Sequence, residues 1–237
     1  METIKQEMVQ YWSQRVEAFS AQRCREFQSS KRQLWLAEFA KYIPMHTQMR
    51  ILDLGTGTGF FATLLAMAGH DVTGIDLTAH MIEEAKRKAA QYGIPASFYV
   101  MDAEKPVFPA QSFDVLISRN LTWALPHLDA AYASWHRLLK KGGLLLNFDA
   151  DYCHEKEEAV LPENHAHKQI APELMDQYEV MKKELRQPYQ RPQWDVELLQ
   201  QAGFSRVQID TTVWQRIYAS VDEFYNPTPI FTIAAYA

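Results

Sequence analysis

The sequence predicts an α/β protein whose seven strands form one doubly wound, mostly parallel sheet that ends in an antiparallel strand. Two observations predict this fold. Between residues 49 and 149, short and nearly all-apolar segments alternate with helical segments, as expected for parallel strands that helices cover on both faces. The last two strand-like runs, 207–212 and 230–237, lie outside this alternation and suit an antiparallel pair at the end of the sheet.

The N-terminal region predicts helix over residues 3–40. Apolar side chains recur there at helical spacing in two stripes, formed by Met8, Trp12, Val16 and Phe19 and by Leu34, Trp35 and Phe39. Pro44 closes the region, because a proline does not continue a helix.

The alternating region contains five of the strands and three helices. Strands are expected at 49–54, 71–76, 96–101, 113–118 and 144–149. Helices are expected at 60–69, 78–93 and 129–143. Cap residues set the helix bounds: Thr78 is the N-cap of the second helix, Gly69 and Gly93 end the first two, and paired glycines at 142–143 close the third.

Residues 151–190 interrupt the alternation. They are rich in His, Glu, Lys, Pro and Tyr and predict a helix near 172–186, which indicates an insertion over the sheet rather than a second domain. A helix and turn at 194–204 restore the pattern before the last two strands.

Composition and charge restrict the class of protein. The chain has 237 residues, 47% of them hydrophobic and 22% charged, which is ordinary for a globular domain. The net charge is −5 and no basic run exceeds residues 86–88, so we expect no nucleic-acid partner. Cys24 and Cys153 lie far apart, and no apolar run approaches the roughly 20 residues of a membrane-spanning helix. We therefore expect a soluble, reduced, cytoplasmic protein without a membrane partner.

The stretch ILDLGTGTGFF, residues 51–61, predicts a ligand site. Glycine loses more backbone freedom on folding than any other residue, so a tight turn or a close ligand must require Gly55, Gly57 and Gly59. In an open parallel sheet, ligands bind outside the carboxyl ends of the strands, where this stretch lies. Asp76, about 20 residues further on at the end of the second strand, is placed to accept hydrogen bonds from ribose hydroxyls.

Two nucleotide-like cofactors compete for this turn. The dinucleotide pattern G-x-G-x-x-G requires its third glycine at position 60, where the chain has Phe60. Asp53 would also repel a pyrophosphate, whereas its carboxylate suits a ligand that carries a positive charge. Both residues favour a positively charged cofactor over a dinucleotide.

Four motifs in order, LDLGTGTG, GIDLT, MDAE and RLLKKGGLLL, resemble the class I S-adenosylmethionine-dependent methyltransferases. The resemblance covers residues 49–149 well and residues 194–237 only in pattern, and YWSQRVEAF near the N-terminus resembles the leader helix of small-molecule members. It implies a Rossmann-like fold in one domain and S-adenosylmethionine as cofactor, with S-adenosylhomocysteine as product. The domain would comprise an N-terminal helical lid, a cofactor-binding core, an inserted lid segment and the end of the sheet, at residues 1–45, 46–150, 151–193 and 194–237.

The same resemblance implies roles for particular residues. The methionine part of the cofactor would be lined by the glycine turn, with Asp53, Gly55, Thr56, Gly57 and Gly59. The nucleoside would be bound by Asp76 at the ribose, Leu77 and Met81 along the adenine, and Asp102 with Ala103 at the adenine edge. Asn120 would close the site, and Tyr11, with Arg15 one helical turn later, would cover the methionine carboxylate.

The sequence contains fewer signals for the methyl acceptor than for the cofactor. The fourth strand ends in SRNLTW, which lacks the N/D-P-P-Y/F pattern associated with methylation of planar amino groups in nucleic acids or glutamine, and neither cysteine lies there. A small-molecule acceptor is therefore expected, with no catalytic residue assigned. Its candidate contacts are Trp123, Asp149, Tyr152 and His154, with Asn120, His127 and Asp151 beside them.

Other interpretations of the sequence stay open. A methyltransferase acting on a protein, a cofactor-binding protein without catalysis, and a NAD-type oxidoreductase each fit part of the pattern. A metal site is not expected, because the candidate ligands match no compact tetrahedral spacing. These candidates are Cys153, His154, Glu155, Glu157, Glu158, His165 and His167.

Overall fold

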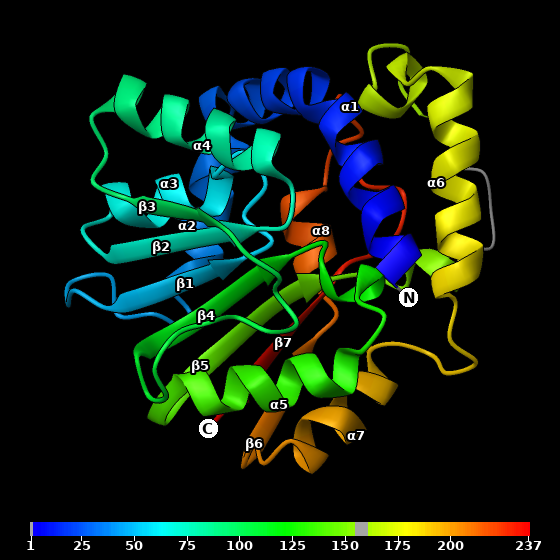
Figure 1. Cartoon of the computed structure of the whole chain (residues 1–237). Helices are drawn as coiled ribbons and strands as arrows, with labels where there is room; N and C mark the ends of the chain where they lie inside the picture. The colour runs from blue at the N-terminus through cyan, green and yellow to red at the C-terminus, as the bar shows by residue number, and fades with distance from the viewer. Residues whose placement is uncertain (1, 155–160) are drawn as a thin grey trace.

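The computed structural model describes residues 2–154 and 161–237. These residues form one seven-stranded sheet in the order β3-β2-β1-β4-β5-β7-β6 (Figure 1). The strands are β1 (Arg50–Leu54), β2 (Asp71–Asp76), β3 (Ser97–Val100), β4 (Phe113–Arg119), β5 (Leu139–Asp149), β6 (Arg206–Asp210) and β7 (Phe231–Tyr236).

The pairing of the strands confirms the predicted fold class. The pairs from β3 through β5 are parallel, whereas β7 runs antiparallel to both β5 and β6. The chain moves outward from β1 to β3 on one side and from β4 to β5 on the other, so the strand order reverses between β1 and β4. This reversal is where an open α/β sheet binds ligands, at the carboxyl ends of the strands.

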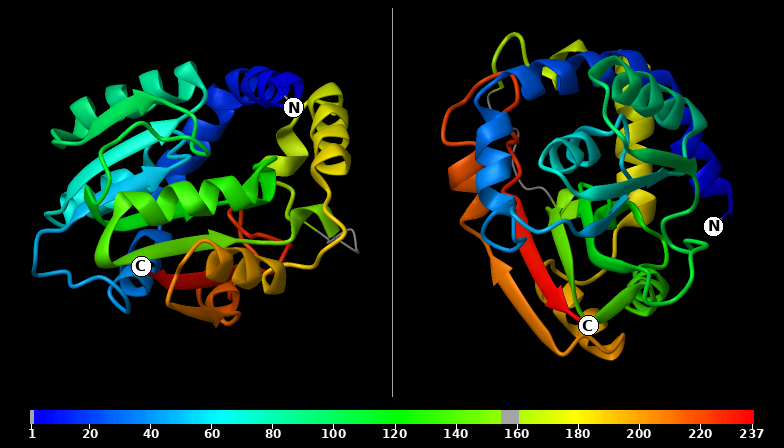
Figure 2. Two further views of the ribbon diagram at one scale, coloured as in Figure 1. Left: turned by 60° about the horizontal axis from the view of Figure 1, so that its bottom comes forward. Right: turned by 90° about the vertical axis from the view of Figure 1, so that its left-hand side faces the viewer.

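Helices cover both faces of the sheet, which forms the middle layer (Figures 1 and 2). One face packs against α2 (Lys31–Phe39), α3 (Phe60–Met67), α4 (Ala79–Tyr92) and α8 (Val213–Ile217), and the other against α5 (Leu128–Leu138) and α7 (Gln193–Gln201). Side chains alternate between the two cores along each strand, so Leu144 and Leu146 belong to the first and Leu145 to the second. All three are at most 5% exposed, which explains why the central strands are apolar throughout.

Two further helices lie past the carboxyl ends of the central strands. The long helix α1 (Glu2–Gln28) crosses this edge and meets α6 (Pro172–Leu185), as Figure 2 shows. Tyr11 of α1 stacks on Tyr178 of α6 with ring centroids 5.7 Å apart. The connections at this edge include three short 3-10 helices, η1 (Thr122–Ala124), η2 (Tyr152–His154) and η3 (Ala166–Gln169). The helix predicted near residues 172–186 is confirmed as α6, which lies over this edge of the sheet.

The predicted helix over residues 129–143 is wrong at its end. Helix α5 stops at Leu138, and β5 begins at the next residue. The paired glycines lie inside the strand, where Gly142 has φ +73° and its N–H donates to the carbonyl of Ala237. A Cβ atom on Gly143 would lie 2.8 Å from the carbonyl oxygen of Lys140. The glycines therefore allow a bend in β5 rather than ending the helix.

At two other helix boundaries, the structure differs in part from what the sequence predicts. The helix predicted over residues 3–40 is two helices, separated at Ser29 and Ser30, where the hydroxyl of Ser29 donates to the carbonyl of Glu26. Thr78 has the extended backbone of an N-cap, but its side chain makes no cap hydrogen bond. No helix in the described part of the chain is long and apolar enough to cross a membrane.

Candidate active site

A cavity of about 250 Å³ lies at the carboxyl ends of the strands, where the strand order reverses. Its floor comes from the turn after β1 and from the ends of β2 and β4, and α1 and α6 cover it. The predicted site residues in its lining are Tyr11, Asp53, Gly55, Thr56, Gly57, Asp76, Leu77, Met81, Asp102, Ala103, Asn120, Trp123 and Tyr152. The tertiary structure thus brings together most of the residues that the sequence predicts.

The three glycines of the turn have different roles. All have positive φ, at +64° for Gly55, +54° for Gly57 and +82° for Gly59. A Cβ atom on Gly55 would lie 2.7 Å from Leu121 Cδ1, and one on Gly57 would lie 3.3 Å from Phe19 Cε1. Gly59 is not in the cavity lining and instead begins α3. The first two glycines therefore shape the cavity, and the third allows the turn to enter the helix.

We expect Gly55→Ala to unfold at lower urea concentration than Gly93→Ala. The two glycines have φ angles of +64° and +65°, so both variants bear the left-handed backbone cost of about 1–2 kcal/mol. Only Gly55 has a neighbour in the way, since nothing lies within 4 Å of a Cβ on Gly93. Overpacking against Leu121 should lower the free energy of unfolding by about a further 1–3 kcal/mol. Equal losses in the two variants would contradict a tightly packed turn.

Asp53 is buried at the end of β1 and is held by the turn that follows it. Its Oδ2 accepts hydrogen bonds from the hydroxyl of Thr56 at 2.6 Å and from the N–H of Ala62 at 3.1 Å. Burial raises the pKa of Asp53 to about 7, although these hydrogen bonds and the charge of Arg119 oppose the rise. Both hydrogen bonds use Oδ2, so Oδ1 leaves a carboxylate oxygen for a ligand in the cavity.

Asp76 joins the glycine turn to the start of α4. Its Oδ2 accepts the N–H of Gly57 at 2.9 Å, and its Oδ1 accepts the N–H of Thr78 at 2.8 Å. Burial raises the pKa of this carboxyl, and the two backbone donors oppose the rise. Each carboxylate oxygen has capacity for a second hydrogen bond. Asp76 is therefore oriented to accept from a pair of hydroxyl groups.

The end of β3 contributes an acidic side chain that α1 already contacts. Lys5 Nζ lies 2.7 Å from Oδ2 of Asp102 and also contacts the buried carboxylate of Glu104. Glu104 in turn accepts the N–H of His127 at 2.7 Å. The carbonyl of Ala103 accepts the indole N–H of Trp135 at 2.7 Å, which fixes the backbone at this corner of the cavity.

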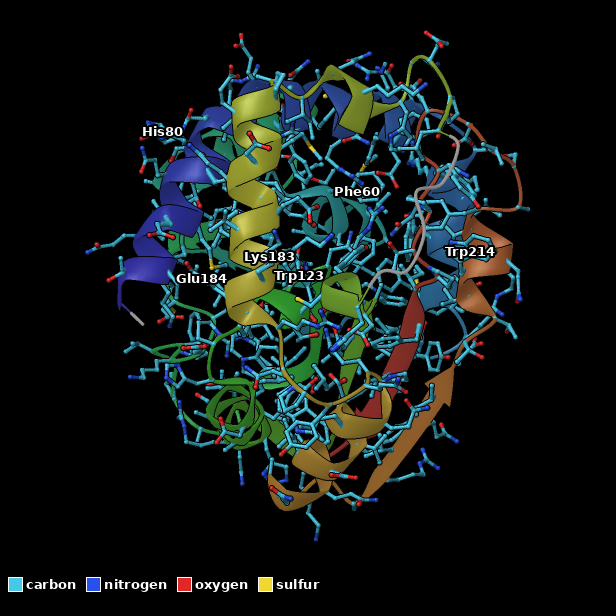
Figure 3. All side chains as sticks on the ribbon, turned by 90° about the vertical axis from the view of Figure 1, so that its right-hand side faces the viewer. Phe60, His80, Trp123, Lys183, Glu184 and Trp214 are labelled. Carbon is cyan, nitrogen blue, oxygen red and sulfur yellow. The ribbon has the colours of Figure 1, made fainter. Side chains whose placement is uncertain are left out.

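The far end of the cavity is aromatic and has one chain of polar groups. Trp123 packs edge-to-face against Tyr152 and Tyr178, each with ring centroids 5.6 Å apart, and Figure 3 shows Trp123 beside α6. The hydroxyl of Tyr152 donates to Asn120 Oδ1 at 3.0 Å and accepts from Asn226 Nδ2 at 2.7 Å. Asn120 has φ +53°, a backbone conformation that side chains other than glycine seldom adopt and that clusters at functional sites.

The structure does not bring Asp149 to the cavity. This carboxylate is 0% exposed and accepts from the N–H of Trp123 at 3.0 Å and from that of Ala150 at 2.8 Å. It also contacts the hydroxyl of Thr122, and Arg191 Nη1 lies 3.4 Å from its Oδ2. Asp149 is thus enclosed by protein partners and positions the loop that carries Trp123.

His154 also lies away from the cavity. Its Nδ1 lies 2.7 Å from Oδ1 of Asp151, and both residues border a separate small pocket of about 20 Å³ with Tyr189 and Trp194. The ring Nδ1 of His127 instead lies 3.2 Å from Oε2 of Glu104. Among the residues that the structure describes, no group of three His, Cys, Asp or Glu side chains could hold a metal ion. Glu155, Glu157 and Glu158 lie outside the described residues.

A buried ionic cluster beside the cavity was not expected from the sequence. Glu26 of α1 is 0% exposed and accepts from Arg119 Nη2 at 2.9 Å, from the indole of Trp35 at 3.1 Å, and from Arg23. The guanidinium of Arg119 also lies over the ring of Trp35, with Cζ of Arg119 4.5 Å from the ring centroid. Arg119 directly precedes Asn120, and a charged residue at the end of an otherwise apolar strand is the signal that could have found it.

Comparisons with known proteins agree with this geometry. Residues 51–143 match a family described as a methyltransferase domain. The chain is 40% identical over 101 residues to the aklanonic acid methyltransferase DauC of Streptomyces sp. (strain C5). The aligned region covers 41% of this chain and 46% of that protein. The matches to curated relatives span less than half the length of those proteins.

Solved structures show the same fold at lower identity. A phosphoethanolamine N-methyltransferase 2 of Haemonchus contortus, in complex with phosphomonomethylethanolamine and S-adenosylhomocysteine, aligns with TM-score 0.62 and 18% identity over 85% of this chain and 51% of that chain. The [4+2]-cyclase SpnF aligns with TM-score 0.60 and 17% identity over 88% of this chain and 81% of that chain. Since these two structures carry different activities by name, the fold by itself does not fix the reaction.

Proposed function

The chain carries a class I S-adenosylmethionine-dependent methyltransferase domain, and we propose that it transfers a methyl group from S-adenosylmethionine to a small-molecule acceptor. The observation that carries this proposal is the meeting of Asp53, the glycine turn and Asp76 in one covered cavity at the strand reversal. A carboxylate at the end of β1 suits a cationic ligand, and one at the end of β2 suits ribose hydroxyls.

The residues present fit the proposed cofactor. Gly55 and Gly57 line the cavity where the methionine part would lie, and Oδ1 of Asp53 would face an ammonium group. Asp76 would accept the two ribose hydroxyls. The remaining contacts would come from Thr56 beside the methionine part, Leu77, Met81, Asp102 and Ala103 around the adenine, and Tyr11 and Asn120 at the edges. When bound, S-adenosylmethionine supplies a methyl group that its positively charged sulfur already activates.

The protein's contribution is then to position the acceptor and exclude water. Residues 1–45 and 151–193 would act as lids, since α1 and α6 from these segments cover the cavity. Trp123 and Tyr152 would contact the acceptor. Burial raises the pKa of Tyr152 well above its ordinary value, so its hydroxyl stays protonated and serves to orient the acceptor by hydrogen bonding.

A small acceptor is supported by the cover over the cavity and by the aromatic residues that line its far end. One relative is named for the methylation of a small molecule, aklanonic acid, and another is a ubiquinone biosynthesis O-methyltransferase of Coxiella burnetii. A protein side chain would have to enter between α1 and α6.

Calorimetry and labelled methyl transfer test this function together. Wild-type protein should bind S-adenosylhomocysteine and should not bind NAD, and labelled methyl groups should pass to a metabolite extract rather than to a protein lysate. Binding of NAD without S-adenosylhomocysteine would favour an oxidoreductase. Label confined to protein would favour a protein methyltransferase, and cofactor binding without any transfer would favour a binding protein.

The affinity for S-adenosylhomocysteine should rise with pH through the pKa of Asp53. That pKa is raised to about 7 in the free protein, and an ammonium group beside the carboxylate lowers it, so binding releases a proton. Since roughly a tenth of Asp53 is ionised one unit below its pKa, the affinity should increase about tenfold between about pH 6 and pH 7.5. Asp53→Asn keeps an oxygen acceptor for Thr56 and Ala62, and its affinity should stay nearly constant over the same range. A wild-type profile as flat as that of the variant would separate Asp53 from the cofactor.

A further inference from the structure

Arg15 of α1 places a buried guanidinium in the wall of the cavity. Arg15 is 7% exposed, lines the cavity from α1, and has an Nε that no acceptor reaches. No hydrogen bond or ion pair joins it to any residue among 2–154 and 161–237. A buried charge without a partner is costly, so such a group in a cavity wall is explained by a ligand of opposite charge.

The groups around Arg15 do not neutralise it. Its electrostatic neighbours are the phenol groups of Tyr11 on its own helix and Tyr178 on α6. Burial lowers the pKa of the Arg15 guanidinium, and these two hydroxyls oppose the change. Burial also raises the pKa of Tyr11, so that phenol remains uncharged and can donate a hydrogen bond beside the cation.

A different arginine pair lies at the methionine end of the proposed cofactor site. Arg119 is close enough to Asp53 to lower the pKa of that carboxyl. The Arg23 guanidinium lies 4.8 Å from the ring centroid of Phe19, which is the side chain that a Cβ on Gly57 would meet. Arg23 also has a buried Nε that no acceptor reaches in the described part of the chain. Since Glu26 supplies one negative charge to Arg23 and Arg119, this pair retains one positive charge for the single carboxylate of the cofactor.

The cofactor therefore has no second anionic group that could pair with Arg15. Tyr178, its neighbour on α6, packs against Trp123 at the aromatic end of the cavity. Resting on the function proposed above, we propose that Arg15 binds the anionic group of the methyl acceptor, which is an organic anion with an apolar body. The anion is a carboxylate or a phosphate monoester, because either pairs with a guanidinium in a bidentate manner. Trp123 and Tyr152 cover the apolar body of the acceptor.

Fractionation of the acceptor pool tests the charge of the acceptor. A metabolite extract of the source cells is divided on an anion exchanger, and each fraction is supplied with labelled S-adenosylmethionine and wild-type protein. Label should appear only in the retained fraction. Treatment of that fraction with alkaline phosphatase before the reaction distinguishes the two anions, since it removes a phosphate monoester and leaves a carboxylate. Label only in the unretained fraction overturns the inference, whereas label in neither fraction counts against methyl transfer itself.

Arg15→Gln, Arg15→Lys and Arg23→Gln test which arginine meets the acceptor. With the active fraction, Arg15→Gln should raise KM about 100-fold and change kcat little, because it removes a charged anchor from an acceptor that is bound in both ground and transition states. Arg15→Lys should recover part of this loss. S-adenosylhomocysteine should bind Arg15→Gln within about threefold of wild type but bind Arg23→Gln more weakly. Loss of S-adenosylhomocysteine binding in Arg15→Gln, with an unchanged KM for the acceptor, would place Arg15 on the cofactor and overturn the inference.

Discussion

Asp76→Ala should weaken the binding of S-adenosylhomocysteine by about 100-fold or more, because a charged hydrogen bond contributes about 1.5–3 kcal/mol and this carboxylate would accept two. The carboxylate also accepts the N–H groups of Gly57 and Thr78, so its removal loosens the turn that shapes the cavity. Isothermal titration calorimetry measures the loss directly. Asp76→Asn, which retains one acceptor oxygen, should show a smaller loss.

Asp71→Ala is the matched control for this experiment. Asp71 begins the strand that Asp76 ends, its side chain is 61% exposed, and it lies 3.9 Å from Arg50 in a surface ion pair. Its removal should leave the affinity within about twofold, since exposed ion pairs contribute about 0–1 kcal/mol and this one lies at the opposite end of the sheet. A folded Asp76→Ala protein that binds S-adenosylhomocysteine as well as Asp71→Ala does would refute the proposed ribose contact.

Arg191→Met should lower the free energy of unfolding by about 3–5 kcal/mol, because it leaves buried carboxylates without their cation. Arg191 Nη2 lies 2.6 Å from Oδ1 of Asp195, and Nη1 lies 3.4 Å from Oδ2 of Asp149. Both carboxylates are 0% exposed and the arginine side chain is 6% exposed, so water does not replace the lost partner. Urea denaturation followed by tryptophan fluorescence measures the change.

The loss in the free energy of unfolding of Arg191→Met should be smaller at low pH. Burial already raises the pKa of Asp149 in the wild-type protein, and removal of Arg191 raises it further. A carboxyl whose folded pKa exceeds its unfolded pKa favours the folded state more at low pH, so the deficit of Arg191→Met should shrink from about pH 8 to about pH 5. Lys140→Met, which removes a 46% exposed partner of Asp114, should cost less than about 1 kcal/mol. A loss in Arg191→Met no larger than in Lys140→Met would contradict a structural role for the buried pair.

The nucleotide end of the candidate site was predictable because its determinants are local. Asp53 and the glycines lie within seven consecutive residues, and the positive φ angles that the turn requires can be met there only by glycine at low cost. Asp76 follows from the rule that parallel strands present their carboxyl ends at one edge. Strand β2 accordingly has the predicted bounds of residues 71–76. The prediction for α5 is wrong only at its end, because a glycine pair within a bent strand is the same local signal as a helix stop.

The acceptor end depends on contacts between distant segments. In the sequence, Asp53, Asp76 and Asp149 are equivalent, since each ends an apolar strand. Only the tertiary structure places Arg191, 42 residues further on, against Asp149 and removes that carboxylate from the cavity. The same holds for Glu26, which pairs with Arg119 across 93 residues. Among the described residues, Arg15 is then the arginine of the cavity lining that has no hydrogen bond or ion pair.

The sequence by itself therefore determined the fold class, the turn and the chemistry of the proposed cofactor, because backbone conformation and strand-end position are set by neighbouring residues. The tertiary structure alone decided which charged side chains are available to a second ligand. That choice depends on which charges are buried against a partner and which are buried without one, and burial and pairing are properties of the packed chain.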